Sequence, residues 1–171
     1  MTAPLTLVHL VCGATGAGKS TYARQLAQDL GGVRFSIDEW MQMLHNADKP
    51  ETNLFEWFFE RVQRNCRQMR ATADQLARLG IPAIFDCGLT NQAERRIFTD
   101  WAEEMGYCSQ LHFIDVPAKT RWRRVERRNL ELGETFHFHV SRDMFDFIES
   151  IWEPPNGVEM ARLNGLRISG P

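Results

Sequence analysis

The sequence lacks any apolar run long enough to cross a membrane, and it carries little net charge. A membrane-spanning helix needs about 20 apolar residues, whereas the apolar stretch Thr6–Cys12 is short and leads directly into a glycine-rich segment. That stretch also does not match a secretory signal peptide. The net charge of -2 gives no overall attraction to nucleic acid or to an acidic membrane. We therefore expect a cytoplasmic protein without a membrane partner, in which only a local basic cluster binds anions.

Cysteine and histidine are few and are not arranged for metal binding. No two of the cysteines form a CxxC pair, which argues against a zinc site; they are Cys12, Cys66, Cys87 and Cys108. His137 and His139 have no third ligand beside them. His9 and His112 alternate with other residues in candidate strands. We expect reduced thiols, as in cytosolic proteins, and histidines of the core or of a sheet face.

The pattern along the chain predicts a single α/β domain spanning residues 1–171. Hydrophobic residues make up 43% of the chain and charged residues 25%, which is typical of a globular domain. Short apolar runs alternate with segments of helical spacing, and this order predicts a parallel sheet covered on both faces. The expected strands are Leu5–Cys12, Val33–Ile37, Pro82–Cys87, Ser109–Val116 and Leu163–Ser169, and the expected helices are Gly18–Leu30, Glu39–His45, Leu54–Leu79, Gln92–Met105, residues 118–132 and Val140–Trp152.

Apolar spacing also predicts which helix faces are buried. In the longest helix the expected buried face is Phe55, Phe59, Val62, Cys66, Met69, Ala73 and Leu76. In the helix Val140–Trp152 it is Val140, Met144, Phe147, Ile148 and Ile151. Asp38 is expected to cap the helix that follows it, and Asn91 with Glu94 forms a capping box.

A phosphate-binding loop is the strongest signal in the sequence. Gly13-Ala14-Thr15-Gly16-Ala17-Gly18-Lys19-Ser20, followed by Thr21, matches G-x-x-x-x-G-K-[ST] and lies between a strand and a helix. Glycine lets the backbone N–H groups turn toward one anion, and the helix N-terminus adds positive potential. Lys19 is expected to reach the β- and γ-phosphates of ATP, and Ser20 to offer its hydroxyl to Mg²⁺. The fold class follows: a P-loop NTPase three-layer α/β/α sandwich with a central parallel sheet.

Missing motifs favour a kinase over other P-loop proteins. The string Asn46-Ala47-Asp48-Lys49 does not fit the N-K-x-D pattern that reads guanine. Asp86 is followed by Cys87, whereas AAA-type motors place a glutamate there, and no transporter signature occurs. A kinase needs an acceptor-side base, a carboxylate near the metal, and cations that close over the phosphates.

Two aspartates and an arginine-rich helix supply these candidates. Asp38 ends the second strand, beside the phosphate loop, and is the candidate general base. Asp86 ends the third strand and is the candidate Mg²⁺ carboxylate. Arg124 and Arg128 share one helix face in a lid at about residues 117–139. A solvated charged helix or a basic patch for nucleic acid would also explain this cluster, whose other members are Lys119, Arg121, Arg123 and Arg127.

With these residues in place, the chain resembles the P-loop kinases of the AAA-like zeta toxin and polynucleotide kinase group, which includes chloramphenicol phosphotransferase. The resemblance covers about residues 5–155. It implies that Asp38 is the base that activates the acceptor hydroxyl and that Asp86 is a carboxylate near the acceptor or the metal. It also implies that Arg124 and Arg128 are lid residues. It rests on Gly13–Thr21, Ser36–Trp40, Phe85–Leu89 with Glu94–Arg96, Arg124–Asn129 and Val140–Pro155.

Two departures bear on the acceptor. Polynucleotide kinases carry an arginine three residues after the base, where this chain has Met41, and a second lid arginine, where it has Leu132. We therefore expect an ATP-dependent phosphotransferase acting on a hydroxyl of a small molecule. The alternatives are a 5′-hydroxyl polynucleotide kinase and a non-catalytic ATP-binding regulatory protein. The sequence leaves the acceptor and the oligomeric state open.

Overall fold

The computed structural model describes residues 6–131 and 139–169. Within them, five strands form one sheet in which every neighbouring pair is parallel. Across the sheet the order is β2 (Val33–Ser36), β3 (Ala83–Asp86), β1 (Thr6–Cys12), β4 (Cys108–Asp115) and β5 (Leu166–Ser169). The helices are α1 (Lys19–Leu30), α2 (Ile37–His45), α3 (Leu54–Arg78), α4 (Gln92–Glu104), α5 (Ala118–Glu131), α6 (Arg142–Ile151) and α7 (Gly157–Arg162), with a 3₁₀ turn, η1, at Asn46–Asp48. The α/β sandwich expected from the sequence is confirmed.

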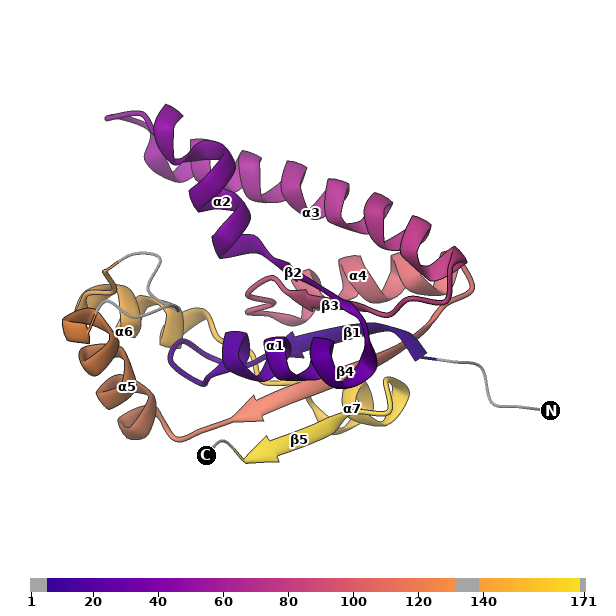
Figure 1. The fold of residues 1–171 in the computed structure, drawn as a ribbon. Helices are drawn as coiled ribbons and strands as arrows, with labels where there is room; N and C mark the ends of the chain where they lie inside the picture. The colour runs from indigo at the N-terminus through magenta and orange to yellow at the C-terminus, as the bar shows by residue number, and fades with distance from the viewer. Residues whose placement is uncertain (1–5, 132–138, 170–171) are drawn as a thin grey trace.

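Alternation along β1 separates the two faces of the sheet. Val8, Leu10 and Cys12 are buried in the cluster that contains residues of α3 and α4. Val11 belongs to the other cluster, which contains residues of α1. Figure 1 shows α1 on one side of the sheet and α3 with α4 on the other. No helix among residues 6–131 and 139–169 is long and apolar enough to span a membrane.

The strand order gathers three connections at one edge of the sheet. β1 lies between β3 and β4, so the segments that follow these strands begin side by side at their carboxyl ends. This edge is where ligands bind in open parallel sheets. Figure 1 shows α5 and α6 beside the loop that joins β1 to α1.

The predicted buried face of α3 is wrong in its first turns. Phe55 is 79% exposed and Phe59 is 52% exposed, whereas Met69 and Ala73 are fully buried. Figure 1 shows the reason, because α2 and the N-terminal part of α3 project beyond the sheet. Periodicity marks an apolar face, but it does not show where the sheet beneath that face ends.

The buried face of α6 is also shifted from the prediction. Val140 is buried as expected, but Met144, Phe147 and Ile151 are exposed. The buried residue of the helix is Phe145, which packs with Val125 of α5 and with Val140. α6 therefore packs against α5 rather than presenting the predicted face to the main core.

Capping residues set the ends of several elements. Asn91 accepts a hydrogen bond from Glu94 N at 2.9 Å, as predicted for the start of α4. Asp38 is not a cap: Ser36 caps α2 by accepting from Glu39 N at 3.4 Å, which places Asp38 inside the first turn. α7 has no counterpart among the predicted helices, although Asn156 caps it by accepting from Glu159 N at 2.9 Å, in the same pattern as α4.

Candidate active site

The phosphate loop joins β1 to α1 and depends on glycine at two positions. Gly16 has φ 79°, and a Cβ there would lie 2.5 Å from the carbonyl oxygen of Arg121. Gly18 has φ 97° and is the N-cap of α1. A side chain at Gly16 would therefore clash with α5, and one at either position would hold a strained backbone.

Lys19 folds over the loop that it follows. Its Nζ donates to the carbonyl oxygens of Gly13 at 2.8 Å and Ala14 at 3.3 Å. Burial lowers the pKa of Lys19, while the charges of Asp86 and Asp38 oppose that shift. An ammonium group that is hydrogen-bonded to loop carbonyls and feels the charge of two carboxylates lies close to where the phosphates of a nucleotide bind in P-loop proteins. Ser20, half-buried, and Thr21, exposed, follow it in the first turn of α1.

Asp38 lies near the same centre. It is half-buried in the first turn of α2, directly after β2. Burial lowers the pKa of Arg128, and the negative charge of Asp38 partly opposes that shift. The same charge also opposes the lowering of the pKa of Lys19. Four predicted residues from β3, α1, α2 and α5 are thereby brought together, namely Asp86, Lys19, Asp38 and Arg128.

Asp86 is held by an ion pair that the sequence analysis missed. It is the last residue of β3 and is 5% exposed. Arg34, on the neighbouring strand β2, donates to Asp86 Oδ2 from Nη2 at 2.8 Å and from Nε at 3.2 Å. Arg34 Nη1 also donates to Glu39 Oε1 at 2.8 Å, and Arg24 Nη2 reaches the same oxygen at 3.2 Å. This network fixes the Asp86 carboxylate from the side of β2.

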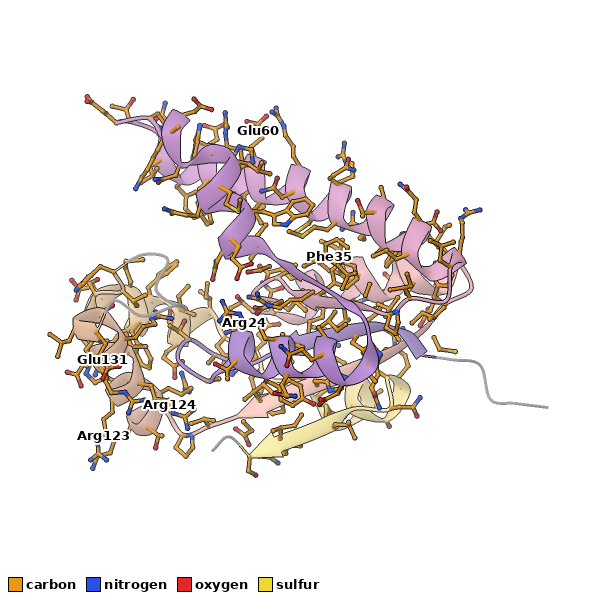
Figure 2. All side chains as sticks on the ribbon, in the orientation of Figure 1. Arg24, Phe35, Glu60, Arg123, Arg124 and Glu131 are labelled. Atoms are coloured by element: carbon orange, nitrogen blue, oxygen red, sulfur yellow. The ribbon has the colours of Figure 1, made fainter. Side chains whose placement is uncertain are left out.

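The arginines of α5 divide by face, as the sequence predicts for Arg124 and Arg128. Arg124 Nη1 donates to the carbonyl oxygen of Ala17, in the phosphate loop, at 3.1 Å. Arg128 is half-buried, and its Nε is buried without a hydrogen-bond partner among the described residues. Arg123 and Arg127 are exposed, and Figure 2 shows Arg123 pointing outward from α5 while Arg124 lies nearer the loop.

Arg121 has a structural role instead of facing a ligand. Its guanidinium forms two hydrogen bonds with Glu149 of α6, at 2.6 and 2.7 Å. It also donates to the carbonyl oxygens of Val116 at 2.7 Å and Thr15 at 3.2 Å. Arg121 thus ties α5, α6 and the loop together. Part of the predicted lid, with Leu132 and His137, lies outside the described residues; Lys119 and His139 are exposed.

A tight turn follows Asp86 and is anchored from below. Gly88 has φ 82° and Leu89 has φ 53°, which is uncommon for a residue with a side chain. Leu89 is nevertheless 1% exposed. Arg95 Nη1 donates to the carbonyl oxygen of Leu89 at 3.2 Å, and the same guanidinium forms a buried ion pair with Glu159. α4 and α7 therefore hold the turn beside the candidate site.

The two strand histidines are structural, as expected. His9 Nδ1 and His112 Nε2 are 3.0 Å apart, and Tyr22 of α1 contacts His112 Nδ1 at 2.8 Å. Burial, aided by the charge of His9, lowers the pKa of His112 to about 4. This chain of contacts joins α1 to the sheet.

These features define a P-loop domain whose loop, two carboxylates and arginine helix meet at one sheet edge. A family model described as an AAA domain matches residues 8–150. The chain belongs to that family. No curated protein sequence gives a match.

Three solved structures, two of them kinases, share the fold. The APS kinase CysC of Mycobacterium tuberculosis, in complex with AMPPNP and APS, is 20% identical with a TM-score of 0.65, over 98% of this chain and 90% of that one. An unliganded sugar kinase from Janibacter sp. HTCC2649 is 19% identical with a TM-score of 0.63, over 96% and 86%. Kti12 of Chaetomium thermophilum, in complex with ADP-AlF3, is 17% identical with a TM-score of 0.71, over 95% and 88%. At these identities the likeness shows that the chain shares the fold of these proteins.

Proposed function

We propose that the protein is an ATP-dependent phosphotransferase that transfers the γ-phosphate to a hydroxyl of a small molecule. The observation that carries this proposal is the meeting of Lys19, Asp38, Asp86 and Arg128 beside the phosphate loop. A non-catalytic nucleotide switch has no need of a carboxylate next to the phosphates on the acceptor side. A kinase needs both that carboxylate and the surrounding cations.

The loop and the first turn of α1 bind the nucleotide in this proposal. Backbone N–H groups of Gly13–Thr21 and the α1 N-terminus face the phosphates. Lys19 Nζ donates hydrogen bonds to Gly13 O and Ala14 O in this structure. When the nucleotide binds, Lys19 donates to phosphate oxygens in their place. Ser20 and the buried carboxylate of Asp86 fit Mg²⁺ bound with the nucleotide, because this ion commonly takes one or two protein oxygens and completes its shell with phosphates and water. When bound, Mg²⁺ offsets charge on the phosphates.

Asp38 is the general base, and the arginines act on the other side of the phosphates. The carboxylate of Asp38 takes the proton of the acceptor hydroxyl as the oxygen attacks phosphorus. Arg128 has a buried Nε with no partner among the described residues, and such a donor is satisfied by a phosphate oxygen. Arg124, already against the loop, stabilises charge as the phosphoryl group moves. In this proposal residues 1–171 act as one domain, with the lid at about 117–139.

The surroundings of Met41 favour a small acceptor over a nucleic acid end. Met41 is 7% exposed, and Asn65 Nδ2 of α3 contacts its sulfur at 3.4 Å. The position where polynucleotide kinases place an arginine is therefore part of the contact between α2 and α3. Two structural neighbours, a sugar kinase and an APS kinase, are named for small molecules.

The test is phosphoryl transfer from γ-labelled ATP to a panel of sugars, nucleosides, antibiotics and 5′-hydroxyl oligonucleotides. Lys19→Ala should abolish transfer. Arg128→Met and Arg123→Met form a matched pair on one helix: the first should lower transfer about 10²-fold or more, by analogy with losing one transition-state donor, and the second should leave it nearly unchanged.

Three outcomes would change the proposal. Label on oligonucleotides alone, with binding that weakens steeply with salt, would identify a polynucleotide kinase. ATP binding without transfer to any acceptor would favour the regulatory reading. Equal losses in the two arginine variants would remove Arg128 from the mechanism.

A further inference from the structure

An arginine on the edge strand β2 holds Asp86 by a single oxygen. Arg34 is opposite Ile84 in the pairing of β2 with β3, two residues before Asp86, so Arg34 and Asp86 are diagonal neighbours on one face of the sheet. That face is the one covered by α1, because Ile84 belongs to the core cluster that contains residues of α1. Arg34 Nε and Nη2 both donate to Asp86 Oδ2, at 3.2 and 2.8 Å. The exposed fraction of the side chain is 10% for Arg34 and 5% for Asp86, so the pair is largely shielded from water.

The second carboxylate oxygen of Asp86 is left for a ligand. Asp86 accepts no hydrogen bond at Oδ1 from the described residues. Arg128 Nε is the one buried side-chain nitrogen or oxygen without a partner within residues 6–131 and 139–169, so Asp86 Oδ1 is reached by solvent. A free carboxylate oxygen at the carboxyl end of a parallel strand is a ligand that suits Mg²⁺. The ion pair with Arg34 therefore decides which oxygen of Asp86 is available to an ion.

Arg34 also ties Asp86 to the helix that carries Asp38. Nη1 of Arg34 donates to Glu39 Oε1 at 2.8 Å. Glu39 directly follows Asp38 in the first turn of α2. One guanidinium group thus joins the end of β3 to the start of α2. Arginine is suited to this because its planar group offers five N–H donors in a fixed arrangement, whereas lysine offers a point charge.

We propose that Arg34 is a positioning residue for both carboxylates of the candidate site. It holds Asp86 so that Oδ1 is available to Mg²⁺ bound with the nucleotide, and through Glu39 it fixes the turn that carries the general base. This inference rests on the proposed function, which assigns Asp86 to Mg²⁺ and Asp38 to the acceptor. Hydrogen-bonding partners of metal ligands contribute about 10–100-fold to metal affinity in other proteins.

The opposite edge of the sheet supplies a matched control. Arg167 of β5 is opposite Phe113, two residues before Asp115 at the end of β4. Its Nε and Nη2 both donate to Asp115 Oδ2, the first at 2.8 Å. This arrangement repeats that of Arg34 and Asp86, but the side chains are 70% and 36% exposed and no ligand is proposed for them.

The experiment measures ATP affinity by isothermal titration, once with Mg²⁺ and once with EDTA, for the wild type and its variants. The readout is the gain in affinity that Mg²⁺ gives, which a general loss of folded protein does not change. Arg34→Met should lower this gain by about threefold or more, with the affinity in EDTA within about threefold of wild type. Arg34→Lys should lower the gain by a smaller factor, because the charge remains but the paired donors are lost. Arg167→Met should leave the gain unchanged, and an equal loss in that variant would overturn the proposal.

A double variant shows whether Arg34 acts through Asp86. Asp86→Asn alone should lower the gain from Mg²⁺ at least as much as Arg34→Met, and the double variant should show no further loss, because both changes act on one carboxylate. An unchanged or larger gain in Arg34→Met would overturn the proposal, since the guanidinium would then only repel the ion. An unchanged gain in Asp86→Asn would overturn it as well. Circular dichroism checks folding; if Arg34→Met does not fold, Arg34→Lys decides, and an unchanged gain in that variant overturns the proposal.

Transfer of labelled phosphate, measured on the same preparations, tests the link to α2. Glu39→Gln leaves the contacts between Arg34 and Asp86 in place, so the gain from Mg²⁺ should persist while the transfer rate falls by about threefold or more through misplacement of the base. An unchanged transfer rate would overturn the part of the proposal that involves Glu39. Absence of transfer by the wild type would instead refute the proposed function and with it the effect on transfer. The affinities in Mg²⁺ and EDTA would still decide whether Arg34 orients Asp86.

Discussion

Replacing Arg95 by methionine should destabilise the protein strongly, because it leaves a buried carboxylate without its partner. Arg95 is 1% exposed and Glu159 is 6% exposed. Their side chains share two hydrogen bonds, Nε to Oε1 at 2.6 Å and Nη2 to Oε2 at 2.9 Å. Removing one member of such a pair costs about 3–5 kcal/mol. The variant also loses donors to the carbonyl oxygens of Leu89 and Glu153.

Urea unfolding followed by circular dichroism measures the free energy of unfolding for this variant and its controls. Arg95→Met should lower it by about 4 kcal/mol. The double variant Arg95→Met/Glu159→Leu should recover part of that loss, because no buried charge is left unpaired. A cost below about 1 kcal/mol for Arg95→Met would refute the reasoning. If the loss in the free energy of unfolding for the double variant equals the sum of the losses for Arg95→Met and Glu159→Leu alone, the two residues are not coupled.

Two further predictions follow from the phosphate loop and the buried histidines. Gly16→Ala should reduce nucleotide affinity at least tenfold, because its Cβ would meet Arg121 O at 2.5 Å; Gly80→Ala is the matched control, since Gly80 has a similar φ of 74° and no atom within 4 Å. Isothermal titration should show normal affinity for the control, and equal affinity for both variants would contradict the clash. Because the pKa of His112 is about 4 in the fold and 6.5 ordinarily, the unfolded chain takes up the proton first as pH falls. The free energy of unfolding should therefore drop by about 2 kcal/mol from pH 7 to pH 5. His112→Gln should lose this part of the pH dependence in urea unfolding, and an unchanged slope would assign it elsewhere.

The phosphate loop could be predicted because its signal is local and contiguous. Gly13–Thr21 encodes backbone conformation, phosphate contacts and the start of α1 within one short stretch. The placement of Asp38 and Asp86 followed from a second general rule, that ligands gather at the carboxyl ends of parallel strands. Helix geometry was enough to separate Arg124 and Arg128 from Arg123 and Arg127.

Features that depend on contacts between distant segments could not be read in this way. Arg34 and Asp86 are 52 residues apart, and no motif announces their pairing. An arginine inside a short strand is itself a signal, because a charge in a sheet needs a partner. The aromatic residues of α3 and α6 were assigned to the core because their spacing is helical. Whether Phe55 or Phe147 is covered depends on where neighbouring elements end, which the sequence does not state.

The most direct test of the proposed mechanism is Asp38→Asn, with MgATP affinity and phosphoryl transfer measured on the same preparation. The amide keeps the size of the side chain but accepts no proton. We predict a dissociation constant for MgATP within about threefold of wild type, because loop contacts are intact, and a transfer rate reduced by about 10²–10⁴-fold, the usual contribution of a general base. Transfer within about threefold of wild type, at unchanged affinity, would contradict the account and remove Asp38 from catalysis.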